Sequence, residues 1–131
     1  MQNIVFIRKY KPHTYTTRMW VVVSMDLEKA VSVVEDQTHY SLNLGPSYLK
    51  SADVITSMII DHDGSQRIFI FIRPTVSNGR VAHEANHAMN YIFSHHGVKL
   101  SLTNDEHQCY YLEMIVDRIY RALDRFIKKS S

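Results

Sequence analysis

The chain has 131 residues, of which 45% are hydrophobic and 21% are charged, and its formal net charge is +2. These values are ordinary for a soluble globular protein, and a chain of this length is long enough to bury a core as one domain, residues 1–131. So small a charge does not indicate nucleic acid as a partner, and no stretch approaches the roughly 20 apolar residues of a membrane span.

Cysteine usage favours a reducing compartment. Cys109 is the one cysteine, so no internal disulfide can form and a cytoplasmic protein is expected. The first nine residues contain a four-residue apolar run closed by two cations, a pattern that does not resemble a signal peptide. Cys109 itself falls within a helical pattern and is expected to be a small core residue.

The first part of the chain predicts two strands and a helix. Residues 4–7 and 18–24 are rich in β-branched and aromatic side chains, which favour strands. Asp26 can cap a helix over about 26–36. The apolar residues of this helix recur on one face: Leu27, Ala30, Val31 and Val34. Residues 39–51 contain a Gly-Pro pair and predict a loop.

A β-hairpin is predicted in the middle of the chain. Two β-rich runs, residues 54–60 and 67–72, flank a segment that contains Asp63-Gly64. Asp-Gly between β-formers is a strong hairpin signal. The second run is almost wholly apolar, which predicts a strand that is covered on both faces.

Two long helices are predicted after the hairpin. The segment Ser77-Asn78-Gly79 offers an N-cap for the first, whose helical pattern begins at Arg80 and ends near His95-His96-Gly97, with Gly97 at the C-terminal cap. Its buried face is predicted from the apolar positions Val81, Ala85, Ala88, Met89, Ile92 and Phe93. Residues 98–102 predict a short strand or an extended link, and residues 105–127 predict the last helix. Strands that mostly precede two long helices indicate an α+β fold with a small antiparallel or mixed sheet.

The first of these two helices carries the sequence His83-Glu84-Ala85-Asn86-His87, which has the form H-E-x-x-H. Positions i and i+4 of a helix share a face, so both imidazoles can reach one metal ion. The glutamate beside the first histidine can hold a water bound to that metal, as in hydrolytic zinc sites. The sequence therefore predicts Zn²⁺ held by His83 and His87, with Glu84 as general base.

A third zinc ligand is expected from the last helix, because a catalytic zinc usually takes three protein ligands and leaves one position for water. Glu106 follows His87 after an 18-residue gap, and Glu113 follows it after a 25-residue gap. His107 adjoins Glu106. Each of these three side chains can bind zinc, so the motif alone leaves the choice between them open.

The region from His83 to Asp117 resembles the gluzincin group of zinc metallopeptidases, in which a glutamate ligand follows H-E-x-x-H on a second helix. The resemblance implies Glu106 as this ligand, since its gap is that of the aminopeptidase branch (HExxH-x18-E). The sequences AHEANHAMNYIF and NDEHQCYYLEMIVD, after a strand, also resemble small metallopeptidase-like proteins of bacteriophages, which implies a host cytoplasm. Two features depart from the group: the aminopeptidases' Gly-x-Met-Glu-Asn strand is absent, and the thermolysin branch's Glu-x-x-x-Asp pattern falls at Glu113–Asp117.

The resemblance implies a minimal zincin-like domain with the activity of a zinc metallopeptidase, a hydrolase acting on peptide or protein substrates. It implies that the strand at residues 67–72 flanks the H-E-x-x-H helix and could bind an extended substrate. The alternative is a catalytically inert zincin-like module that binds zinc or a protein partner. The side chains considered for stabilising an oxyanion are His95, His96, Tyr110 and Tyr111.

Overall fold

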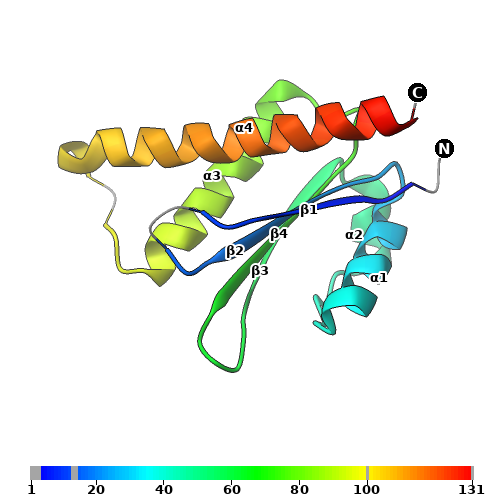
Figure 1. Cartoon of the computed structure of the whole chain (residues 1–131), viewed down its shortest axis with the longest axis horizontal. Helices are drawn as coiled ribbons and strands as arrows, with labels where there is room; N and C mark the ends of the chain where they lie inside the picture. Colours follow the sequence, from blue (N-terminus) through cyan, green and yellow to red (C-terminus); the bar gives the residue numbers. More distant parts are fainter. Residues whose placement is uncertain (1–3, 13–14, 100, 131) are drawn as a thin grey trace.

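The computed structural model describes residues 4–12, 15–99 and 101–130, and within these ranges it has four strands and four α-helices (Figure 1). The strands are β1 (Phe6–Tyr10), β2 (Arg18–Val23), β3 (Val54–Ile60) and β4 (Gln66–Ile72). The helices are α1 (Leu27–Thr38), α2 (Pro46–Ser51), α3 (Asn78–His95) and α4 (Asp105–Ser130), the last preceded by a short 3₁₀ helix. The predicted α+β class is confirmed.

The four strands form one mixed sheet in the order β1-β2-β4-β3. β1 pairs with β2 and β3 with β4 in antiparallel fashion, whereas β2 and β4 are parallel neighbours. β4 is therefore paired on both sides and cannot add a further strand. The prediction that residues 67–72 could bind an extended substrate in this way is wrong, because the edge strand of the hairpin is β3.

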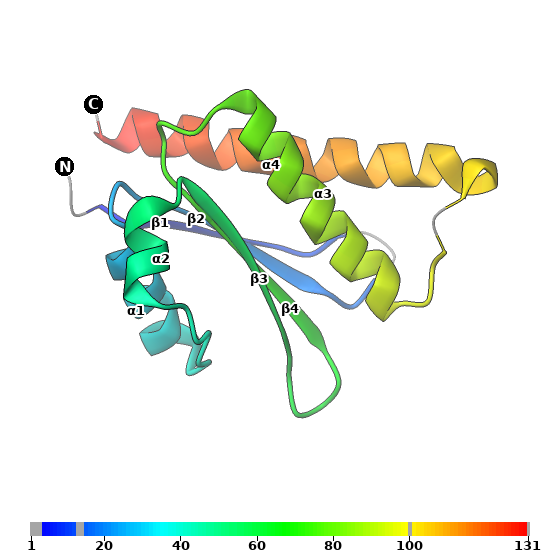
Figure 2. The ribbon, with the colours of Figure 1, turned by 180° about the vertical axis from the view of Figure 1, so that it is seen from behind.

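Helices cover both faces of the sheet, with α1 and α2 on one face and α3 and α4 on the other (Figures 1 and 2). The side chains of β4 divide between the two cores by strand alternation. Ile68, Ile70 and Ile72 join the core under α3 and α4. Phe69 and Phe71 join the core under α1 and α2. The apolar run predicted to be covered on both faces is thus a central strand.

α3 begins and ends where the sequence predicts. The Ser77 hydroxyl accepts a hydrogen bond from the backbone N–H of Arg80, which caps the first turn. At the other end Gly97 has φ 72°, and the Val98 N–H donates to the carbonyl of Phe93. This is the Schellman pattern, in which a left-handed residue closes the last turn. The six predicted apolar positions of α3 are all buried, and the helix is fixed firmly on β3 and β4.

α4 runs for 26 residues over the same face of the sheet and contacts α3, β1 and β2. Its buried side includes Tyr111, Ile115 and Ile119, as a continuous apolar stripe requires. Cys109 is exposed, so its predicted place in the core is wrong. In the described part of the chain, no helix is long and apolar enough to span a membrane.

One local prediction fails. Residues 46–51 form α2 within the segment predicted as a loop, and Pro46 stands in its first turn, where its fixed φ favours a helix. For residues 98–102 the described residues fit the predicted link and not the strand: residues 98, 99 and 101 belong to no strand or helix, and Leu102 begins the 3₁₀ helix. Residue 100 lies outside the described residues.

Candidate metal centre

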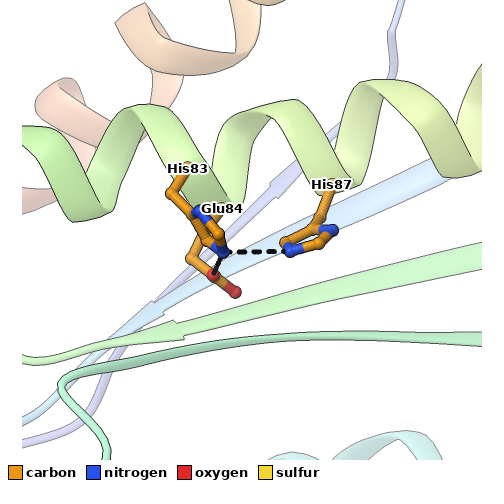
Figure 3. Close-up of side chains that lie close together, drawn as sticks. All are labelled: His83, Glu84 and His87. Atoms are coloured by element: carbon orange, nitrogen blue, oxygen red, sulfur yellow. Dashed lines mark hydrogen bonds and ion pairs between the residues drawn. The ribbon is translucent and has the colours of Figure 1, made fainter.

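His83 and His87 lie one turn apart on α3, and their side chains converge (Figure 3). The two Nε2 atoms are 3.1 Å apart, and the rings lie nearly perpendicular, at 82°. Two nitrogens bound to one tetrahedral zinc at about 2.1 Å lie about 3.4 Å apart. The spacing therefore fits two ligands of a single ion after a shift of a few tenths of an ångström. It equally fits an N–H···N hydrogen bond between the two rings when no ion is bound.

Glu84 completes the cluster from the buried side of the same turn. The residue is only 8% exposed, and its Oε2 lies 3.5 Å from Nε2 of His83. The ligand atoms of Glu84, His83 and His87 all lie within 4.8 Å of one another. Burying a carboxylate is costly unless a positive group lies beside it. A cation bound by the two imidazoles would lie beside the Glu84 carboxylate and would offset the cost of burying it.

The cluster opens into a hollow of about 390 Å³ between α2, β3 and α3. Its volume is within the range of small-molecule sites. From α3, Arg80 and Tyr91 line it one turn before His83 and one turn after His87. Tyr48 lines it from α2, and Thr56 lines it from β3. The Thr56 hydroxyl also donates to the backbone carbonyl of Glu84, at 3.4 Å, and so ties the edge strand to the motif.

Glu106, the predicted third ligand, does not belong to this cluster. It is exposed on the first turn of α4. The three clustered side chains leave α3 on the side that faces the strands, and α4 lies on the other side of the helix (Figure 3). The alternatives Glu113 and His107 also come from α4 and are not part of the cluster. The described residues thus bring together His83, Glu84 and His87 without a ligand from a second helix.

Two other histidines form a separate polar cluster at the C-terminal end of α3. Nε2 of His96 is 3.0 Å from the Thr17 hydroxyl, and its ring stacks on Tyr15 at a centroid distance of 4.5 Å. Nε2 of His107 is 3.0 Å from the Tyr15 hydroxyl, and its ring stacks on Phe93. Both rings are integrated into the packing, and His96 does not line the hollow at the candidate metal cluster.

Burial lowers the pKa of His96, and the charge of the neighbouring His95 lowers it further. The neutral ring is thus the form that the fold favours. The neutral ring can form a hydrogen bond with the Thr17 hydroxyl. The same hydroxyl donates to the buried side-chain oxygen of Gln66 at 2.7 Å. This cluster stabilises the junction of α3 with β2 and β4 and presents no open position to a metal.

The donors beside the metal cluster differ from those considered in the sequence. Tyr111 is buried against the ring of His107, and Tyr110 is exposed on α4. Neither lines the hollow, whereas Arg80 and Tyr48 do. Arg80 could have been found from its spacing, because it lies three residues before His83 on the same helix face. Tyr48 reaches the hollow only through the tertiary fold.

Comparisons of the chain with protein-family models, curated proteins and solved structures gave no match. The resemblance to gluzincins therefore rests on the motif residues and their spacing. Of these, His83, Glu84 and His87 have the placement that the motif requires, on one turn of a capped helix.

Proposed function

We propose that the protein is a zinc-dependent metallopeptidase with His83 and His87 as zinc ligands and Glu84 as general base. The observation that carries the proposal is the convergence of the two Nε2 atoms, 3.1 Å apart, beside the buried Glu84 in an open hollow. Histidines that serve only packing are expected to resemble His96 and His107, whose ring nitrogens face hydroxyls of the fold.

Zinc held at this point would lower the pKa of a bound water toward about 7 and polarise a carbonyl. The contribution of Glu84 is proton transfer. Its carboxylate accepts the proton released when water adds to the peptide carbonyl, and it returns that proton to the leaving nitrogen as the C–N bond breaks. Arg80 and Tyr48 are the donors placed to stabilise the oxyanion, because both line the hollow with Glu84.

The edge strand supports a peptide as substrate. β3 is paired with β4 on one side only, and Val54 and Thr56 of this strand line the hollow. An extended peptide could pair with the outer edge of β3 and would then pass His83 and His87. We propose on the same grounds a minimal zincin-like arrangement, in which a helix with H-E-x-x-H packs beside an antiparallel edge strand.

The third ligand remains a prediction. Glu106 lies on the first turn of α4 and outside the cluster, so it would have to move before it could bind the same ion. In its present position the cluster leaves the remaining metal positions to water and substrate. The absence of Glu106 from the cluster supports one second candidate function, a zincin-like module that binds zinc without turnover.

The Glu84→Gln variant separates the two functions. The amide keeps the size of the side chain but cannot accept the proton, so peptide cleavage should fall by at least about 100-fold while zinc content is unchanged. Cleavage would be followed by mass spectrometry on a mixture of unfolded proteins, with zinc measured per chain. His96→Gln is the matched control and should retain both properties. A wild-type protein that binds zinc and cleaves nothing would establish the inert module instead.

A further inference from the structure

A second hollow lies at the opposite edge of the sheet, between β1 and the C-terminal half of α4. Its volume is about 710 Å³, larger than that of the hollow at the metal cluster. Five cationic side chains line it together with one carboxylate, that of Asp124: Arg8, Arg121, Arg125, Lys128 and Lys129. We call this hollow the basic groove.

The positive charge of the basic groove is only weakly neutralised. Lys128 pairs with Asp124 at 3.2 Å, and Arg121 pairs with Asp117 at 3.3 Å. Both pairs are exposed i,i+4 pairs, and such pairs contribute little to stability. Within the described ranges, no carboxylate lies within salt-bridge distance of Arg8 or Arg125.

Aromatic rings of β1 hold further cations of α4 in place. The Lys129 ammonium lies 5.9 Å from the centroid of the Phe6 ring, and the Arg118 guanidinium lies 4.9 Å from that of Tyr10. Arg8 stands between these two rings on the strand and has the same orientation by alternation. Cation–π contacts position a positive charge without cancelling it. One cation of the groove, Lys129, is thus held on a ring of β1, and the Arg118–Tyr10 contact joins α4 to the same strand.

The small net charge of the chain does not reveal this row of cations. α4 has carboxylates in its first half, among them Glu106 and Glu113, and cations in its second half. The charges of the two halves cancel, so neither half is visible in the net charge of +2 of the whole chain. The fold then adds Arg8 of β1 to the basic half, so that the local charge is high where the average is low. The expectation that nucleic acid is not a partner came from that average.

We propose that the basic groove binds the phosphate backbone of single-stranded nucleic acid. From Arg121 to Lys129 the helix rises about 12 Å. A strand carries one phosphate charge per nucleotide, so a strand that follows this row brings several phosphates to Arg8 and to the four cations of α4 in the groove. Arginine suits this role because its forked guanidinium can bind two phosphate oxygens at once. A cationic groove that follows one backbone is the usual basis of binding without sequence preference.

An acidic protein segment fits the row less well. Its charges stand on side chains that must each be ordered on binding, which costs about 0.5–1.5 kcal/mol for each side chain. A nucleic-acid strand carries one charge per nucleotide on the backbone itself. The regular backbone charge of the strand therefore suits this row of cations better than carboxylates on separate side chains do.

The test is fluorescence anisotropy of a labelled 12-nucleotide oligothymidylate with the full chain in EDTA, so that zinc plays no part. We expect binding that weakens with salt, with a slope of log K against log salt of about −2 to −3, the value when three or four of the five cations contact phosphates of a single strand. The double variant Arg8→Gln/Arg125→Gln should bind at least about tenfold more weakly and reduce the slope by about 1.4. The exposed positions Arg8 and Arg125 make a folding defect unexpected, and circular dichroism would check it.

The matched control is Lys29→Gln/Lys50→Gln, which removes the same charge from α1 and α2. It should leave the affinity within about twofold. Equal losses in the two double variants would overturn the proposal, because net charge alone would then explain the binding. Tighter binding of a 12-residue polyglutamate than of the oligonucleotide would assign the groove to an acidic peptide instead. If the double variant unfolds, Arg125→Gln alone should still weaken binding by about threefold or more, and no change would reject the groove.

Discussion

Two pairs of histidines in the layer of α3 and α4 have opposite surroundings. His83 and His87 direct their Nε2 atoms at each other in a hollow that is open to solvent, and the side chain of His83 is 55% exposed. His96 and His107 direct theirs at hydroxyl groups and stack on aromatic rings. All four residues are helix or helix-end histidines of one small domain. The environment of the ring nitrogens, and not the residue type, separates the pair proposed to bind zinc from the structural pair.

This difference predicts opposite responses to substitution. Changes at His83 and His87 should remove zinc and leave stability nearly unaltered. Changes around His96 and His107 should lower the free energy of unfolding and leave zinc binding unaltered.

The largest effect is expected for zinc affinity. His83→Ala and His87→Ala each remove one of two nitrogen ligands and should weaken zinc binding by more than about 100-fold, since even partners that only orient a ligand contribute 10–100-fold. Competition with a chromophoric chelator measures the affinity. His96→Gln should bind as the wild type does, and a comparable loss in that variant would remove the distinction between the two pairs.

The next effect is on stability at the structural pair. Thr17→Val removes the hydroxyl that serves both Gln66 and His96, and Thr17 and Gln66 are fully buried. We expect a decrease of about 1–3 kcal/mol in the free energy of unfolding, because a buried amide oxygen is left without its donor. Urea denaturation with zinc removed measures it. Thr16→Val at the neighbouring exposed position should change the free energy of unfolding by less than about 0.5 kcal/mol. If both variants lost the same stability, the hydrogen bonds of the Thr17 hydroxyl would not be the cause.

A smaller loss is expected for Tyr15→Phe. The ring and its stacking on His96 are kept, and only the hydrogen bond to His107 disappears. The expected decrease is about 0.5–1.5 kcal/mol, the net contribution of one such bond. Zinc affinity measured on the same sample should be unchanged. A Tyr15→Phe protein with weakened zinc binding would link the two histidine pairs, contrary to their separation in the structure.

The smallest effect concerns pH. The pKa of His96 is lowered in the folded protein by burial, so between its folded and unfolded pKa the unfolded chain binds more protons. The contribution of His96 is thus fully present above the unfolded value of about 6.5 and is lost as the pH falls below it. Urea denaturation of the metal-free protein at pH 7.5 and 5.5 should show this decrease. In the His96→Gln variant, the free energy of unfolding should differ less between pH 7.5 and pH 5.5 than in the wild type. An unchanged difference would mean that groups other than His96 cause the decrease.

Local signals in the sequence account for most of the elements. The Asp26 cap and the apolar stripe predict α1, and Ser77 and Gly97 predict the two ends of α3. The i,i+4 spacing of His83 and His87 likewise places them on one face with Glu84 beside them. These predictions succeed because capping and periodicity depend on residues a few positions apart.

What the sequence does not determine is how the elements pack. The position of β3 at the sheet edge and of β4 in its interior depends on the crossover between β2 and β4. Whether Glu106 can reach the cluster of His83, Glu84 and His87 depends on where α4 packs against α3. The number of residues between His87 and Glu106 does not determine how the two helices pack. For the same reason neither Tyr48 in the metal hollow nor Arg8 in the basic groove could be predicted as site residues.

The most direct test of the metal centre is X-ray absorption spectroscopy of the zinc-loaded protein. We predict one zinc per chain with two imidazole nitrogens at about 2.0–2.1 Å and oxygen in the remaining positions, and loss of the imidazole signal in His83→Ala/His87→Ala. A spectrum with a sulfur ligand at about 2.3 Å, or one that the double substitution leaves unchanged, would contradict the assignment of zinc to His83 and His87.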